Sequence, residues 1–288
     1  MPTVKINGLD LYYEVAGEGE RVVLTHGAWT DGRTWEAVID RLAGRFEVVT
    51  WDRRGHSRSQ AGAGPGSCRQ DAEDLASLIR QLGGGPVDLV GNSAGGNVVL
   101  NLMTLYPELV RNACTHEPGP FALLEGSDDP DIRRLIGEDK DNVARVEELI
   151  GAGEYGRAAR FFVDEVAVGP GAWSQLPEPM RNIIEANALT VSDDLRDSWD
   201  IDSVGLDELV ANEIPLLVSA GSQSPPLEAA AAEELVALMP AARLQLLEGA
   251  GHIPHRTHPD EYAAMLTGFF DEVAGNAGMG VAGEVRSR

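Results

Sequence analysis

The stretch LVGNSAGGNVV, from Leu89 to Val99, decides the fold because it places one serine in a very tight turn. Apolar residues typical of a strand lead into the turn, and an apolar pattern with helical spacing follows it. Gly91, Ser93 and Gly95 fit the pattern Gly-x-Ser-x-Gly, whose small neighbours let a strand reverse sharply into a helix. Amides at the start of that helix favour negative charge developing at the serine. The pattern therefore predicts that Ser93 is a nucleophile.

Strand-like runs alternate with helical patterns on both sides of this turn. Asn7-Gly8 joins two alternating runs and predicts a β-hairpin. Further strand-like runs follow, at 21–27, 46–52, 86–92, 111–117, 215–221 and 242–249. Helical patterns come between or after them, at 35–44, 68–84, 94–109, 226–240 and 259–275. This alternation predicts the α/β class, with a mainly parallel sheet and helices on both faces.

One long segment interrupts the alternation, and no buried strand is predicted in it. Its helical spacing begins after the carboxyl end of a strand, where open α/β sheets bind ligands. We therefore predict an inserted helical lid over residues 119–211, between two parts of a core formed by 1–118 and 212–275. The Gly-rich end, 276–288, is predicted to be a flexible tail.

Composition and charge exclude several classes of partner. The chain has 288 residues, 43% of them hydrophobic, and a formal net charge of −23. Such an acidic surface repels phosphates, so neither nucleic acid nor a membrane is expected as a partner. The two cysteines, Cys68 and Cys114, form no metal-binding pattern, and the first residues do not resemble a signal segment. A reduced, cytoplasmic protein is expected. The sequence leaves the oligomeric state open, a homodimer included.

A serine hydroxyl needs a base to act as a nucleophile at neutral pH. His252 follows the last strand-like run and precedes the last helix, at the end of a Gly-x-Gly-His sequence. A loop at that point can return the imidazole to the carboxyl edge of the sheet. His255 and His258 lie farther toward the helix and are the competing candidates. We predict that His252 is the base.

The oxyanion of an acyl-transfer intermediate needs two preorganised N–H donors. One is expected from Ala94, directly after Ser93. The other is expected from Ala28, in the loop that follows an earlier strand-like run. His26 is expected to brace that loop rather than to contact substrate, and Trp29 is expected to border the pocket.

These motifs together resemble the landmarks of the α/β-hydrolase fold superfamily, and they occur in the family's order. They are His26-Gly27, WDRRGHSRS at 51–59, GNSAGG at 91–96 and GAGHIPH at 249–255. The resemblance extends over nearly the whole chain. It is specific for the superfamily but says little about the substrate.

The acid of the expected triad is displaced in this sequence. The family's usual acid follows the run 215–221 in a pattern similar to Gly-x-x-Asp, and Ser224 stands at that position here. Some branches, including haloalkane dehalogenases and the fungal zearalenone lactonase, carry the acid after the strand that follows the nucleophile helix. Glu117 occupies that position, and we predict that it orients the base and stabilises its charged form. Glu228 and Asp202 remain alternatives.

The resemblance to the lactonase is the closer of the two. It rests on RNACTHE at 111–117, YYE at 12–14, SAG at 93–95 and THP at 257–259. Epoxide hydrolases and dehalogenases of this family use an aspartate nucleophile, so Ser93 argues against both activities. Family perhydrolases keep a serine but carry the late acid, so Ser224 argues against that activity.

The sequence therefore predicts a serine hydrolase that cleaves a small apolar ester or lactone through an acyl-enzyme, without a metal or organic cofactor. A cofactor-free lyase or cyclase acting on a natural-product intermediate, and a ligand receptor with a residual triad, remain as alternatives. Apolar side chains are expected to line the substrate pocket: Trp29, Phe121, Leu124, Phe162 and Trp173, with Leu123, Phe161 and Met180 as further lid residues.

Overall fold

A twisted sheet forms the centre of the computed structural model, which describes residues 2–200 and 205–282, with side chains described as far as residue 275. Its strands are β1 (Thr3–Ile6), β2 (Leu9–Ala16), β3 (Glu20–Thr25), β4 (Phe46–Trp51), β5 (Val87–Asn92), β6 (Val110–His116), β7 (Leu216–Gly221) and β8 (Ala242–Leu247). The eight strands have the order β1-β2-β4-β3-β5-β6-β7-β8. β1, β2 and β4 pair antiparallel, and the pairs from β4 to β8 are parallel.

The predicted hairpin and the buried parallel strands follow directly from local sequence. Asn7 and Gly8 both have positive φ, 49° and 87°, as a type I′ turn between β1 and β2 requires. Val22, Val23 and Leu24 of β3 are all fully buried, because successive side chains point into the cores on opposite faces of the sheet. The fold class is therefore as predicted.

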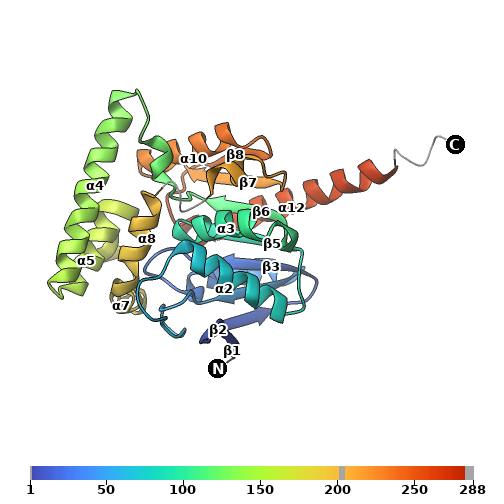
Figure 1. Ribbon diagram of the computed structural model, residues 1–288, viewed down its shortest axis with the longest axis horizontal. Helices are drawn as coiled ribbons and strands as arrows, with labels where there is room; N and C mark the ends of the chain where they lie inside the picture. Colours follow the sequence, from blue (N-terminus) through green and yellow to red (C-terminus); the bar gives the residue numbers. More distant parts are fainter. Residues whose placement is uncertain (1, 201–204, 283–288) are drawn as a thin grey trace.

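Helices cover both faces of the sheet (Figure 1). One face packs against α2 (Cys68–Gln81), α3 (Ala94–Leu105) and α10 (Pro226–Leu238). The other face packs against α1 (Glu36–Leu42) and α12 (Pro259–Ala282). Short helical turns connect these elements: η1 (Gly32–Trp35), η2 (Pro107–Leu109) and α11 (Pro254–Thr257).

The segment between β6 and β7 contains helices joined by short loops and no strand among its described residues, and Figure 1 shows its helices gathered at one end of the sheet. Its elements are η3 (Phe121–Leu124), α4 (Pro130–Gly151), α5 (Tyr155–Phe161), η4 (Phe162–Ala167), α6 (Ala172–Gln175), α7 (Glu178–Ala186), η5 (Ala188–Thr190), α8 (Val191–Ser198) and α9 (Leu206–Val210). They lie inside the range 119–211 predicted to be a lid.

The last helix is longer than the sequence pattern indicated. α12 continues to Ala282, into the range 276–288 predicted to be a flexible tail. Each residue that extends an existing helix adds one backbone hydrogen bond, so the extension can form without an apolar face. Among the described residues, no helix combines the length and apolar character needed to cross a membrane.

A buried charge cluster joins the helical insertion to the core. The Arg53 guanidinium donates from Nε to Asp71 Oδ2 at 3.0 Å and from Nη2 to Asp194 Oδ1 at 2.5 Å. Arg53 follows β4, Asp71 lies on α2 and Asp194 lies on α8 of the insertion. Burial raises the pKa of Asp194 to about 7, although the positive charge of Arg53 opposes that effect.

We predict that Arg53→Met lowers the free energy of unfolding by about 3–5 kcal/mol at pH 8, because it leaves two buried carboxylates without a cation. Urea denaturation measures the change. Arg133→Met is the control, because Arg133 is exposed on α4, and it should change the value by less than about 0.5 kcal/mol. Equal effects of the two substitutions would contradict the prediction.

Candidate active site

The turn from β5 into α3 holds Ser93 in a strained conformation. Ser93 has φ 55° and ψ −128°, a region that costs a non-glycine residue about 1–3 kcal/mol. A Cβ on Gly91 would lie 2.3 Å from the carbonyl oxygen of Gly95, and a Cβ on Gly95 would lie 2.3 Å from that of Thr25. Both positions therefore require glycine, which explains the motif around the serine physically.

The predicted base and acid meet at the carboxyl edge of the sheet. His252 Nδ1 donates a hydrogen bond to Glu117 Oε2 at 2.6 Å, and both side chains are buried. The other carboxylate oxygen of Glu117 accepts from the Gly221 amide at 2.7 Å. Glu117 itself has φ 45°, and its amide donates to the Ser219 carbonyl at 2.9 Å. The ends of β6 and β7 therefore both fix this carboxylate.

Electrostatics favour the charged form of both partners. Burial would raise the pKa of Glu117, but the hydrogen bond and charge of His252 lower it below its usual value. Burial would lower the pKa of His252, but the carboxylates of Glu228 and Glu117 raise it above its usual value. The imidazolium that forms when His252 takes a proton is thus stabilised by its neighbours.

Glu228 is a second buried carboxylate beside this pair. It lies in the first turn of α10, and atoms of Glu228, Glu117 and His252 all lie within 4.8 Å of one another. Its Oε2 has no hydrogen-bond partner among the described residues, and burial raises the pKa of Glu228. Glu228, one alternative acid, is therefore close to His252, but the hydrogen bond belongs to Glu117. The other alternative, Asp202, lies outside the described residues.

Among the described residues, Glu117, Glu228 and His252 also form a group whose side-chain oxygen and nitrogen atoms lie close enough together to bind one metal ion. His252 Nδ1, however, already donates its proton to Glu117. A metal at that nitrogen would have to displace this proton and break the hydrogen bond, so the arrangement favours an acid–base pair over a metal centre.

The competing histidines lie elsewhere. His255 is buried against Trp35, and its Nε2 lies 2.9 Å from Thr34 Oγ1. The His258 side chain makes an exposed hydrogen-bond contact with its neighbour, because its Nδ1 lies 2.9 Å from Thr257 Oγ1. Neither ring lines the cavity that contains Ser93.

His26 braces the loop after β3, as predicted. Its Nδ1 donates to the Gly27 carbonyl at 2.8 Å, and its Nε2 accepts from the Arg53 amide at 2.9 Å. Burial and the charge of Arg53 lower the pKa of His26 to about 4, so the ring is neutral. Both ring nitrogens are occupied, which leaves none for a substrate.

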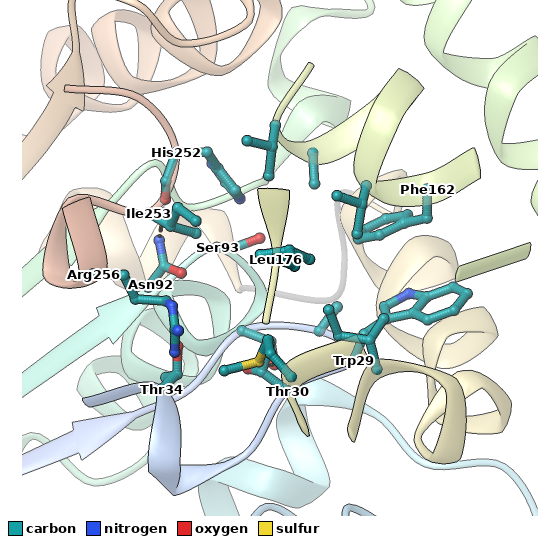
Figure 2. A pocket seen from close by; sticks show the side chains of 17 residues that line it. Trp29, Thr30, Thr34, Asn92, Ser93, Phe162, Leu176, His252, Ile253 and Arg256 are labelled. Atoms are coloured by element: carbon teal, nitrogen blue, oxygen red, sulfur yellow. Dashed lines mark hydrogen bonds between the residues drawn. The ribbon is translucent and has the colours of Figure 1, made fainter. Parts of the chain in front are cut away.

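Ser93 and His252 both line a cavity that opens to solvent and has a volume of about 620 Å³ with the solvent space at its mouth included (Figure 2). Trp29 and Phe162, two of the expected pocket residues, line it as well, together with Ala28 and Met180, and the rings of Trp29 and Phe162 stack with their centroids 5.0 Å apart. The other lining residues are Gly27, Thr30, Thr34, Asn92, Val163, Ala167, Val168, Leu176, Ile184, Ile253 and Arg256. Within the described part of the chain, the Ser93 hydroxyl forms no hydrogen bond with His252. Catalytic hydrogen bonds of this kind often tighten only when substrate binds.

Three predicted pocket residues do not line this cavity. Phe121 and Leu124 pack instead against Leu227 and Ala231 of α10. Trp173 packs within the core of the insertion, and its amide donates to Asp164 Oδ1 at 2.8 Å. Helical spacing shows that these side chains are buried, but it does not show which neighbour buries them.

The two predicted oxyanion donors lie beside the serine. Ala28 lines the cavity, and Ala94 is the first residue of α3. Neither backbone amide donates a hydrogen bond within the described part of the chain. Trp29, next to Ala28, has φ 63°, so the loop is sharply turned at this point.

Asn187 is a buried site residue that the sequence analysis missed. Its Nδ2 donates to the carbonyls of Trp29 at 3.2 Å and Thr30 at 2.9 Å. Its Oδ1 accepts from the Ser57 amide at 2.8 Å. A side chain from the insertion therefore holds the loop that carries Ala28. No local sequence signal marks it, because its partners are distant in the chain.

Sequence relatives point to the same superfamily. An uncharacterized hydrolase of Bacillus subtilis (strain 168) is 31% identical over 142 residues, which are 49% of this chain and 52% of that protein. A putative non-heme chloroperoxidase of Synechocystis sp. is 28% identical over 91% of this chain and 95% of its own.

Solved structures and a family model agree with the sequence relatives. An alpha/beta hydrolase from Sphaerobacter thermophilus is 29% identical with a TM-score of 0.75, covering 93% of this chain and 100% of its own. The enol-lactonase from Burkholderia xenovorans is 20% identical with a TM-score of 0.73, covering 94% and 100%. The model described as "Alpha/beta hydrolase family" matches residues 22–265. The chain belongs to the α/β-hydrolase family.

Proposed function

We propose that the protein hydrolyses a carboxylic ester or lactone through a Ser93–His252–Glu117 triad. The observation that carries this proposal is the 2.6 Å hydrogen bond from His252 Nδ1 to Glu117 Oε2, at the edge of the cavity that Ser93 lines. It orients the ring so that Nε2 is the nitrogen available to accept a proton. Lactone and ester chemistry are both consistent with a largely apolar cavity.

The reaction would proceed in two acyl-transfer steps. Ser93 Oγ attacks the substrate carbonyl carbon and gives its proton to His252 Nε2, while the amides of Ala28 and Ala94 hold the oxyanion. Collapse of the intermediate breaks the bond to the alcohol oxygen, which takes the proton from His252. Water then attacks the acyl-enzyme, losing a proton to the same nitrogen, and Ser93 regains its proton as the acid leaves.

The helical insertion would supply the apolar side of the pocket. Phe162, Val163 and Ala167 belong to η4, a π-helical turn, and all three line the cavity. Such turns are frequent at functional sites because they redirect side chains within a helix. The named activity of the Burkholderia xenovorans neighbour is consistent with a lactone substrate.

We predict that Ser93→Ala lowers kcat for chromogenic esters by about 10⁴-fold or more, because it removes the nucleophile. The folded protein should also label with a fluorophosphonate at Ser93, and the variant should not. Rapid labelling with ester turnover supports the hydrolase. Ser93→Ala protein with full activity would overturn the triad, and a lyase or cyclase that uses only His252 would then be favoured.

Glu228 sets the pH at which His252 becomes a base. A negative charge beside the imidazole stabilises the protonated ring, and the pKa of His252 is raised above its usual value in part by Glu228. We predict that Glu228→Gln shifts the acid limb of the kcat/KM profile to lower pH, because the neutral amide no longer stabilises the imidazolium.

A pH profile of ester hydrolysis between pH 5 and 10 measures this effect, with points about half a unit apart to resolve the limb. Glu233→Gln is the matched control, because Glu233 is an exposed residue of the same helix, α10. An unshifted limb in Glu228→Gln, or one shifted to higher pH, contradicts the role assigned to Glu228.

Asn187 should affect rate more than substrate binding. Asn187→Ala removes two hydrogen bonds to the loop that carries Ala28. We predict that kcat falls by about 10- to 100-fold, since each such bond contributes about 0.5–1.5 kcal/mol. Steady-state kinetics measures the change, and Asn182→Ala, at an exposed position of α7 just before Asn187, is the control. Unchanged kcat in a folded Asn187→Ala protein would show that the loop holds its shape without Asn187.

A further inference from the structure

The cavity beside Ser93 contains one permanent positive charge. Arg256 lines it from α11, four residues after His252, and none of the described aspartates or glutamates lines it. Figure 2 shows Arg256 and Thr34 on one side of Ser93, with Trp29 and Phe162 on the other. The cavity therefore has a cationic, polar end and an apolar end, with the nucleophile between them.

Arg256 lacks the partner that other arginines near the site possess. Arg53, Arg54 and Arg58 each form an ion pair with an aspartate at 3.0 Å or less. Among the described residues, Arg256 has no ion pair within 4.0 Å, no side-chain hydrogen bond and no stacking contact with a ring. Arg133 and Arg181 also lack ion pairs, but both lie on the insertion and outside this cavity.

The Arg256 side chain is also partly removed from water. Arg256 is half-buried, and burial lowers its pKa more than the distant charge of Glu36 raises it. A guanidinium remains charged under these conditions, and the charge of Glu36 offsets its desolvation only in part. In a chain with a net charge of −23, an unpaired cation in a cavity is a site that attracts an anion.

We propose that Arg256 binds a carboxylate of the substrate, so that the preferred substrates are esters or lactones that also carry a free carboxylate. This inference rests on the proposed hydrolase function. The planar guanidinium suits bidentate binding of a carboxylate. The apolar remainder of the substrate would lie toward Trp29 and Phe162.

Matched substrates test the charge directly. One pair places the carboxylate in the acyl part: mono-4-nitrophenyl glutarate and its neutral methyl ester. The second pair places it in the alcohol part: 3-carboxyphenyl butyrate and its methyl ester. We expect the native protein to favour the carboxylate in at least one pair, by kcat/KM. Arg256→Gln should reduce that ratio by about tenfold or more, as expected for the loss of a charged hydrogen bond.

Two further variants distinguish the effect of the Arg256 charge on this ratio from the effect of its planar shape and from an unspecific effect of losing an arginine. Arg256→Lys keeps the charge but not the planar fork, and should give an intermediate ratio. Arg133→Gln removes an exposed arginine of α4 and should leave the ratio unchanged. The ratio in the native protein should also fall as salt is added. A folded Arg256→Gln protein with the native ratio, or a native protein without preference in either pair, overturns the proposal.

A binding measurement distinguishes failure of this inference from failure of the hydrolase assignment. Monomethyl glutarate is titrated calorimetrically into Ser93→Ala protein, which needs no turnover, and into the Ser93→Ala, Arg256→Gln double variant. Binding that is lost with Arg256 supports the anion site even if no ester is hydrolysed. Ester hydrolysis without Arg256-dependent binding or preference supports the triad and refutes the anion site.

Discussion

The close backbone approach between β5 and α3 is the constraint on which the site depends. Two glycines let the chain reverse within a space where any Cβ would lie 2.3 Å from a carbonyl oxygen. The reversal fixes Ser93 at φ 55° and points it beyond the sheet edge, next to the first amides of α3. Because β5 is central in a parallel sheet, loops from neighbouring strands converge on the same point.

That convergence explains how a carboxylate on a different strand can reach His252. Ser224 stands where the family's usual acid would follow β7, and Glu117 at the end of the adjacent β6 holds the imidazole instead. The end of β7 still contributes, because the Gly221 amide donates to Glu117. Neighbouring parallel strands end close together, so either can place a carboxylate beside the same histidine. The buried Glu228 in α10 places a second carboxyl group at this point.

Buried charged side chains in this protein are generally paired, so the ones without a partner need a separate explanation. Arg53 satisfies Asp71 and Asp194 and thereby ties α8 of the insertion to the core. Within the part of the chain that the structure describes, Arg256 has no such partner and lines the cavity, and the Glu228 Oε2 atom beside His252 has none either. Unpaired buried groups cost stability, so their presence at one site is the pattern expected of a site that binds a ligand or moves a proton.

The sequence by itself determined the α/β class, the tight turn that carries Ser93, the place of His252 at the carboxyl edge of the sheet and the helical insertion. These features depend on local patterns, namely alternation, glycine spacing and the order of elements along the chain. Only the tertiary structure decided which side chains face the cavity. Phe121, Leu124 and Trp173 are apolar and helical as expected but pack elsewhere. Arg256 lines the cavity and Asn187 holds a loop beside it, and neither has a local signal. The physical reason is that periodicity fixes which face of a helix is buried, while the neighbour that buries it depends on contacts between residues far apart in the sequence.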